Sequence, residues 1–433
     1  MTGYEIVASL VSLTAIASYI NAKFIKLPTS VGVTLVSLIL SLFVTISGKI
    51  GFELNDIAQD FIDSISFDET FLEGMLSFLL FAGALHINGL ELSRYKLLVI
   101  LLATVSVIVS TILVGYAMHG VTTMFNIGIP MSYCFVFGAL ISPTDPIAVI
   151  GILKHLKVPK PLEIKIAGEA LFNDGMGIVL FVIALNIATG AQQQISPTNI
   201  FLCFVKQGIG GGLLGVVLGL LTSYLLKTID DYDVGVILTL AVVTGGYTLA
   251  HSVLHVSGPI AMAGAGLIIG SSMNKGKMTK ETVVRIDSFW ELIDGVMNAI
   301  LFVLIGLEFI SISFDFETSM ASIAAIIIAL AARWISISLP VSFLNQNRRF
   351  DSAILIIMTW GGLRGGISIA LALSIQGEYH NFMVSVTYAV VLFSIMVQGL
   401  TISPLIKAKM ESDSYNYKNE KEKLPNDNMV RER

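Results

Sequence analysis

The sequence predicts an all-α, polytopic membrane protein with about thirteen transmembrane helices. Of its 433 residues, 55% are hydrophobic and 13% are charged, whereas soluble domains carry about 25% charged residues. The apolar residues fall in runs close to the roughly 20 residues that a helix needs to cross a bilayer. This composition excludes a soluble enzyme, a nucleic-acid-binding protein and a disordered chain, and it makes the lipid bilayer the expected surroundings.

Thirteen apolar segments are the expected spans. Their approximate bounds are 4–21, 29–48, 71–90, 97–118, 131–153, 166–189, 200–226, 233–253, 258–273, 286–311, 318–343, 350–375 and 382–405. Strict alternation of apolar and polar residues, which is typical of membrane β-barrels, is not found in these runs.

The basic residues give the expected orientation. With the N-terminus outside, 22 of the 26 lysines and arginines fall in inside segments and Lys49 in an outside loop. Cytoplasmic loops carry such an excess of positive charge. We therefore expect residues 1–406 to form a transmembrane domain and 407–433 a charged cytoplasmic tail. The layout indicates a multi-pass protein of a prokaryotic plasma (inner) membrane.

The fifth span carries two prolines and a carboxylate in the sequence SPTDP, residues 142–146. Pro143 and Pro146 have no N–H group to donate, so carbonyl groups near Ala139 and Ser142 lose their helical partners. Irregular backbone at membrane depth is tolerated only inside protein or beside a water-filled cavity. We expect a break in this helix, with Thr144 and Asp145 within it.

The sixth span contains Glu169, Asn173 and Asp174 near its middle. A charge at mid-span costs at least about 2.5–3.5 kcal/mol, and such groups usually mark a transport pathway. Asp174 shares a helix face with Ala170 and Gly177, so a backbone or an ion can approach it closely. Glu169 lies about 140° round the helix, and we expect it to face another partner.

The twelfth span contains Arg364 within WGGLRGG, residues 360–366, where four glycines weaken the helix. A buried guanidinium stays protonated and needs an anion, and we expect Glu169 to be that partner. Arg333 in the eleventh span is expected either to pair with an acid or to extend to the inner face.

The two interrupted spans are seven apart and therefore run in opposite directions. Broken helices at corresponding places in two halves are typical of inverted-repeat transporters with a site at the membrane midplane. Near the inner end of the tenth span, Asp287, Glu291 and Asp294 share one side. They are expected to form a solvated helix end, with an inner funnel as the alternative.

Four motifs carry a resemblance to a known family. SPTDPIAVIGILK, GEALFNDGMGIVLFVIAL, VSGPIAMAGAGLIIG and WGGLRGGISIALALSI resemble the NhaP-type sodium/proton antiporters of the monovalent cation:proton antiporter-1 family. The resemblance covers all thirteen spans. It implies the NhaA-like antiporter fold, in which two discontinuous helices cross within a mobile core bundle. It also implies a homodimer held by a separate dimerisation bundle, and no cofactor beyond the transported ions.

The resemblance also assigns roles to residues. Asp174, preceded by Asn173, matches the aspartate that binds the cation and the proton. Asp145 and Thr144 match the second carboxylate and its threonine, so Na⁺ or Li⁺ is expected on Asp174, Asp145 and Thr144. Glu169 and Arg364 match a structural ion pair. Where related sequences often have serine after this glutamate, this chain has Ala170.

The chemistry of the residues agrees with electroneutral Na⁺(Li⁺)/H⁺ exchange by alternating access. A buried carboxylate needs a compensating proton or cation, so the two compete for Asp174. Potassium/proton exchange is the main alternative, because side chains alone do not define ion size. Alternatives from other classes are a cation channel or pH sensor, and an intramembrane aspartyl protease, whose Gly-x-Gly-Asp motif is absent from this sequence.

Overall fold

The described part of the chain is almost entirely helical. The computed structural model describes residues 2–50, 54–65, 67, 70–145, 149–151, 153, 156, 158, 160–190, 197–273, 278–312, 315–344 and 352–409. Pro146 and residues 410–433 of the expected tail therefore lie outside the described residues.

The helices follow one another along the chain as listed here. They are α1 (Gly3–Ile20), α2 (Thr29–Lys49), α3 (Leu54–Asp63), α5 (Leu76–Leu85), α6 (Gly89–Ser93), α7 (Lys96–Leu101), α8 (Val107–Met124), α9 (Met131–Ile141), α11 (Lys160–Ala188), α12 (Pro197–Leu226), α13 (Tyr232–Thr248), α14 (Gly258–Met273), α15 (Lys280–Leu307), α16 (Phe316–Leu344), α17 (Ser352–Trp360), α18 (Gly366–Leu373) and α19 (His380–Phe393). Short π-helical or 3₁₀ turns extend several of them.

The helices agree with the predicted membrane protein. In the described residues, nine helices are long and apolar enough to cross a membrane, and three shorter apolar helices accompany them. Each of the thirteen predicted segments contains helix, and the twelfth holds two short helices, α17 and α18. The all-helical fold class is therefore confirmed, while the count of thirteen spans stays a prediction.

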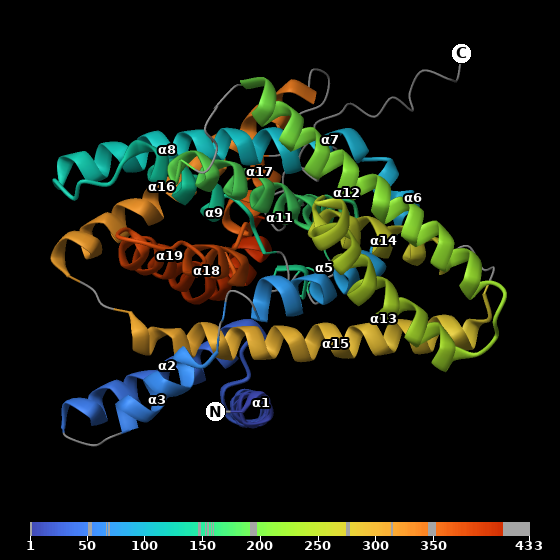
Figure 1. Ribbon diagram of the computed structural model, residues 1–433, viewed down its shortest axis with the longest axis horizontal. Helices are drawn as coiled ribbons and strands as arrows, with labels where there is room; N and C mark the ends of the chain where they lie inside the picture. The colour runs from blue at the N-terminus through green and yellow to red at the C-terminus, as the bar shows by residue number, and fades with distance from the viewer. Residues whose placement is uncertain are drawn as a thin grey trace, which may run out of the picture.

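The helices pack into two groups. The first bundle consists of α1, α2, α5, α12, α13, α14 and α15, and the second bundle consists of α7, α8, α9, α11, α16, α17, α18 and α19. In Figure 1, α15 runs below α18 and α19, with α1, α2 and α3 beneath it, and α8 runs above α18 and α19. Contacts between the bundles include those of α11 with α12 and α14, and of α15 with α18.

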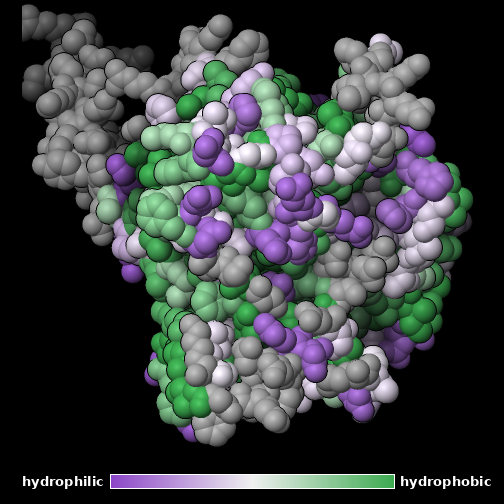
Figure 2. All heavy atoms as spheres, turned by 60° about the vertical axis from the view of Figure 1, so that its left-hand side comes forward, coloured by the Kyte–Doolittle hydropathy of each residue, from purple (hydrophilic) through white to green (hydrophobic). Residues whose placement is uncertain are grey.

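The outer surface of the helices is strongly apolar. Large hydrophobic side chains are exposed along α1, α12, α13 and α16, for example Phe201, Leu213, Ile237 and Ile327. On the face shown in Figure 2, broad hydrophobic areas flank a patch of hydrophilic residues. Contiguous exposed apolar surface of this extent is rare in soluble monomers and is the surface expected of helices that contact lipid.

The first bundle depends on close approach between α14 and α5. A Cβ atom added at Gly270 of α14 would collide with the backbone carbonyl of Leu85, the last residue of α5. Small residues at such crossings let membrane helices pack with their backbones in contact. Gly270 therefore sets the distance between these helices.

Replacing Gly270 tests this packing. Gly270→Ala is expected to destabilise the protein by about 1–3 kcal/mol, the usual cost of overpacking a core. Gly245→Ala is the matched control, because a Cβ at Gly245 in α13 meets no atom within 4 Å and alanine favours helix. Thermal unfolding in detergent should show a lower Tm for the first variant only. An equal Tm for both would contradict the close packing.

Candidate functional site

The first interrupted helix ends where the prolines predict. α9 ends at Ile141, and donors from the twelfth predicted span reach carbonyl groups at its end. Ser368 Oγ donates to the Leu140 carbonyl at 2.7 Å. Arg364 Nη1 donates to the carbonyls of Ser142 and, at 2.8 Å, Pro143. The predicted loss of a helical hydrogen-bond donor for a carbonyl near Ser142 is thus confirmed. The donors that replace it are the side chains of Arg364 and Ser368.

The second interruption lies beside the first. Between α17 and α18 the backbone leaves the helix, and the Asp145 N–H donates to the Leu363 carbonyl at 2.7 Å in an antiparallel bridge. The Arg364 N–H donates to Ser394 Oγ at 2.8 Å, which anchors the segment to the end of α19. The predicted crossing of two discontinuous helices is therefore present.

Each break places a charge at the end of the other helix. The Arg364 guanidinium lies at the C-terminal carbonyls of α9. The Asp145 carboxylate lies over Gly365, where an added Cβ would come 2.6 Å from Oδ2, at the N-terminus of α18. Helix C-termini carry partial negative charge and N-termini partial positive charge. Both charges therefore face helix ends of opposite sign.

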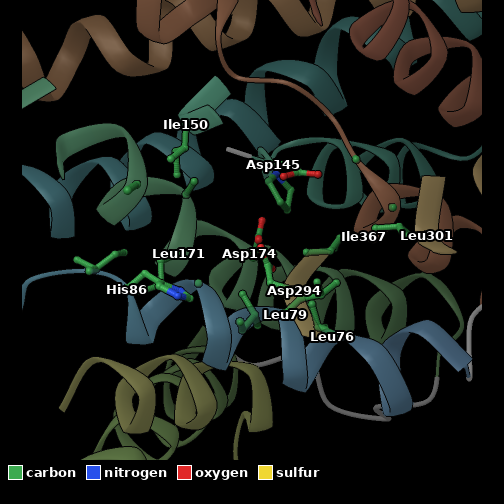
Figure 3. Close-up of a pocket in the computed structure, with 18 of the residues that line it drawn as sticks. Leu76, Leu79, His86, Asp145, Ile150, Leu171, Asp174, Asp294, Leu301 and Ile367 are labelled. Carbon is green, nitrogen blue, oxygen red and sulfur yellow. The ribbon is translucent and has the colours of Figure 1, made fainter. Parts of the chain in front are cut away.

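A cavity of about 320 Å³ lies between the two bundles and reaches this crossing. Asp145 and Asp174 line it from the second bundle, and α5 and α15 line it from the first. Figure 3 shows the Asp174 side chain pointing toward Asp145 across the cavity. The Asp174 residue is 7% exposed. The two carboxylates predicted to bind the ion therefore face one shared space.

The small residues on the Asp174 face of α11 have the predicted effect. Ala170 lines the cavity one turn before Asp174. A Cβ added at Gly177 would collide with the Pro143 ring, so glycine at this position lets the broken segment lie directly against α11. The sequence thus brings both an open space and a second backbone to the aspartate.

Thr144 and Asn173 lie behind the cavity wall. Both are almost fully buried, at 2% and 0% exposed, and Asn173 Nδ2 donates to Thr144 Oγ1 at 2.8 Å. The Asn173 amide also lies 3.5 Å from Glu169 Oε1. In this structure the two residues connect the broken segment to α11, and the carboxylates of Asp145 and Asp174 face the cavity.

The expected pairing of Glu169 with Arg364 is wrong. Glu169 forms its ion pair with Arg333 of α16, through Nη1 and Oε1, and both residues are buried. The prediction assumed that a buried guanidinium needs a carboxylate. Arg364 instead meets carbonyl groups at a helix end, whose partial negative charge serves as its anion. The expectation that Glu169 faces a different partner from Asp174 is confirmed.

The cavity lining contains further polar residues. Glu291 and Asp294 of α15 line it, which supports the inner-funnel alternative. Glu163 and His86 also line it, and His86 Nε2 lies 3.4 Å from Asp287 Oδ1. Sequence reasoning did not single out Glu163 or His86. Their positions near the ends of two predicted spans, on the same side of the membrane as Glu291, were the available signal.

These features define an α-helical membrane transporter with a carboxylate site where two broken helices cross. Residues 10–408 match the family model described as "Sodium/hydrogen exchanger, transmembrane", and the chain belongs to this family.

The comparisons with individual proteins agree with this family. The chain is 43% identical to the Na⁺/H⁺ antiporter NhaP of Pseudomonas aeruginosa, over 93% of this chain and 96% of that one. It is 35% identical to the Na⁺/H⁺ antiporter NhaH of Halobacillus dabanensis, over 89% and 93%. The sodium proton antiporter MjNhaP1 of Methanocaldococcus jannaschii has a similar fold, with a TM-score of 0.66 at 18% identity over 87% and 98% of the chains.

A double-mutant cycle distinguishes the observed ion pair from the expected one. Glu169→Gln is expected to destabilise the protein by about 3–5 kcal/mol, because it leaves the Arg333 charge buried without its partner. Adding Arg333→Gln should restore most of this loss, whereas adding Arg364→Gln should not. Thermal or chemical unfolding in detergent measures both couplings. A larger coupling of Glu169 with Arg364 would refute the assignment.

Proposed function

We propose that the protein exchanges Na⁺ or Li⁺ for protons at Asp174 by alternating access. The observation that carries this proposal is the pair of carboxylates, Asp145 and Asp174, facing one cavity at the crossing of two broken helices. Sodium and lithium are hard cations that prefer oxygen ligands, and two carboxylates supply them. The names of the relatives from Pseudomonas and Halobacillus give independent support.

The exchange follows from the cost of an unpaired charge. Asp174 is nearly inaccessible to solvent, and an ionised carboxylate in such a place needs a proton or a cation as compensation. Asp174 can accept either one. If the site crosses the membrane only when it is compensated, movement of Na⁺ in one direction is coupled to movement of H⁺ in the other.

The two bundles supply the moving parts. Asp145, Asp174 and the crossing all belong to the second bundle, while α5 and α15 of the first bundle form the opposite wall of the cavity. Movement of the second bundle against the first would carry the complete site from one side to the other. Such rigid-body movement of one bundle past another is the common form of alternating access.

The proposed stoichiometry is one cation for one proton. Asn173, beside Asp174, is neutral and already donates to Thr144, so it adds no second titrating group. During the moving step, Thr144 is proposed to turn its hydroxyl to the cation. Ala170 presents a methyl group to the cavity, which removes one oxygen ligand and makes potassium the competing cation to test.

The assembly is proposed to be a homodimer in a prokaryotic plasma membrane, with the N-terminus outside and the C-terminus in the cytoplasm. The exposed apolar helices α1, α12 and α13 and the distribution of lysine and arginine support this arrangement. In this orientation the cavity opens toward the cytoplasm, because His86, Glu163 and Glu291 all lie near the inner ends of their spans.

The function is tested in everted membrane vesicles with a pH-sensitive dye. Addition of Na⁺ or Li⁺ should dequench the dye, and K⁺ should give a much smaller response. Asp174→Asn should abolish the response to every cation, since the amide neither binds a proton nor supplies a negative charge. Expression and Tm of this variant are the control for folding. A preserved response would move the site away from Asp174, and a dominant response to K⁺ would establish potassium/proton exchange.

The stoichiometry is tested by membrane voltage. Exchange of one monovalent cation for one proton moves no net charge, so the initial rate in proteoliposomes should not change when valinomycin and potassium set the voltage at fixed Na⁺ and H⁺ gradients. The uncoupled rate of Asp174→Asn vesicles serves as the baseline. A rate that rises severalfold with 100 mV would show that net charge crosses with each cycle.

A further inference from the structure

The interface between the bundles is closed at the end opposite the cavity mouth. The polar lining residues His86, Glu163 and Glu291 mark the cavity mouth, whereas the closed end lies at the last turn of α15. There Phe71, Ile310 and Tyr388 are buried in one apolar cluster with Phe309 packed against it. Apolar contact of this kind excludes water without directional bonds.

A hydrogen bond crosses between the bundles at this closed end. The Tyr388 hydroxyl of α19 donates to the Ile305 carbonyl of α15 at 2.9 Å. α19 packs on α16 and α18 of the second bundle, and α15 packs on α1, α2 and α5 of the first. Tyr388 is 1% exposed, so no water competes for this bond.

The surroundings of the Tyr388 hydroxyl supply it with a hydrogen-bond acceptor in the absence of water. Ile305 lies in the last turn of α15, which ends at Leu307, and carbonyls in the last turn of a helix lack intrahelical donors. The Phe309 ring lies 6.2 Å from the Tyr388 ring. A buried tyrosine hydroxyl usually finds a partner, and here that partner belongs to the other bundle.

We propose that Tyr388 is a positioning residue for exchange, which latches the two bundles in the state whose cavity opens at the His86 end. The inference rests on the proposed alternating access: when the second bundle moves, α19 slides against α15 and this bond breaks. Tyr388 is not among the residues that line the cavity with Asp145 and Asp174. It sets the fraction of molecules in which Asp174 is open to the His86 side.

The effect of losing the latch has a definite size and sign. A buried hydrogen bond contributes about 0.5–1.5 kcal/mol, so its loss should shift the ratio of the two states by about two- to tenfold. Apparent affinity falls with the population of the binding-competent state. Na⁺ should therefore bind more weakly from the His86 side and more tightly from the opposite side.

The chain offers a matched control. Tyr247 of α13 donates its hydroxyl to the Leu72 carbonyl at 2.9 Å, and Leu72 lies in the turn (Thr70–Met75) that leads into α5. Tyr247 belongs to α13 and Leu72 to the turn that is continuous with α5, so neither end of this bond lies on a helix of the second bundle. Tyr247→Phe thus removes the same kind of bond without releasing one bundle from the other.

The experiment compares Tyr388→Phe with Tyr247→Phe in the full-length protein. Spin labels at Ile50→Cys and Met124→Cys, exposed residues at the ends of α2 and α8, report the distance between bundles in a background without Cys134 and Cys203. Tyr388→Phe should enlarge a second distance population about two- to tenfold, and Tyr247→Phe should leave it unchanged. Phe309→Leu, which removes the ring contact, should shift the population in the same direction.

Transport from the two sides gives the second readout. In proteoliposomes of known orientation, Tyr388→Phe should raise KM for Na⁺ on the His86 side and lower it on the other. A merely structural defect would lower activity from both sides. Unchanged distances, or equal effects of the two phenylalanine variants, would overturn the latch. Absence of exchange in the unmodified protein would overturn the proposed function. The distance measurement would still show whether Tyr388 holds the two bundles in one state.

Discussion

The structure depends on satisfying backbone groups that two broken helices release at membrane depth. No water competes for such groups in the hydrocarbon region, so each must find a partner within the protein. The two breaks supply partners to one another: Arg364 donates to carbonyls at the end of α9, and Asp145 donates its N–H to Leu363. The Asp145 carboxylate then lies at the start of α18, whose positive end favours its charge. The position of the Asp145 carboxylate therefore follows from the hydrogen bonds that the two interrupted helices make with one another.

A second network holds α11 at the correct rotation beside this crossing. Glu169 pairs with Arg333, and Asn173 donates to Thr144, so two polar side chains of α11 are directed away from the cavity. Asp174, on another face of the same helix, is left toward the cavity with Ala170. The polar contacts of Glu169 and Asn173 thus fix the rotation of α11, and this rotation directs the Asp174 carboxylate into the cavity.

Much of the fold and part of the site follow from local sequence. Apolar run length predicts the helices, the prolines predict the end of α9, and helical spacing predicts that Ala170 and Gly177 share the face of Asp174. The partner of Glu169 does not follow, because Arg333 and Arg364 are equally suitable in charge and only the path of the chain through the second break separates them. The burial of Thr144 behind Asn173 likewise depends on the direction in which the unwound segment leaves α9. Glu163 lies three turns before Asp174 on the same face of α11, so helical spacing does place it along the cavity. His86 comes to the same cavity only through the packing of α5 against α11, which no local pattern encodes.

The distribution of strong and weak interactions matches what a two-state transporter requires. The buried ion pair of Glu169 with Arg333 connects α11 to α16 within the second bundle, and a partly exposed contact of 3.4 Å between His86 Nε2 and Asp287 Oδ1 connects the end of α5 to α15 within the first. Breaking a buried ion pair costs about 3–5 kcal/mol, which would strongly favour one state if such a pair joined the bundles. At the closed end, apolar surface and the Tyr388 hydroxyl join them instead. Apolar surfaces can slide with little change in buried area, and one hydrogen bond contributes only about 1 kcal/mol. The two states can then remain within a few kcal/mol of each other, as population exchange requires.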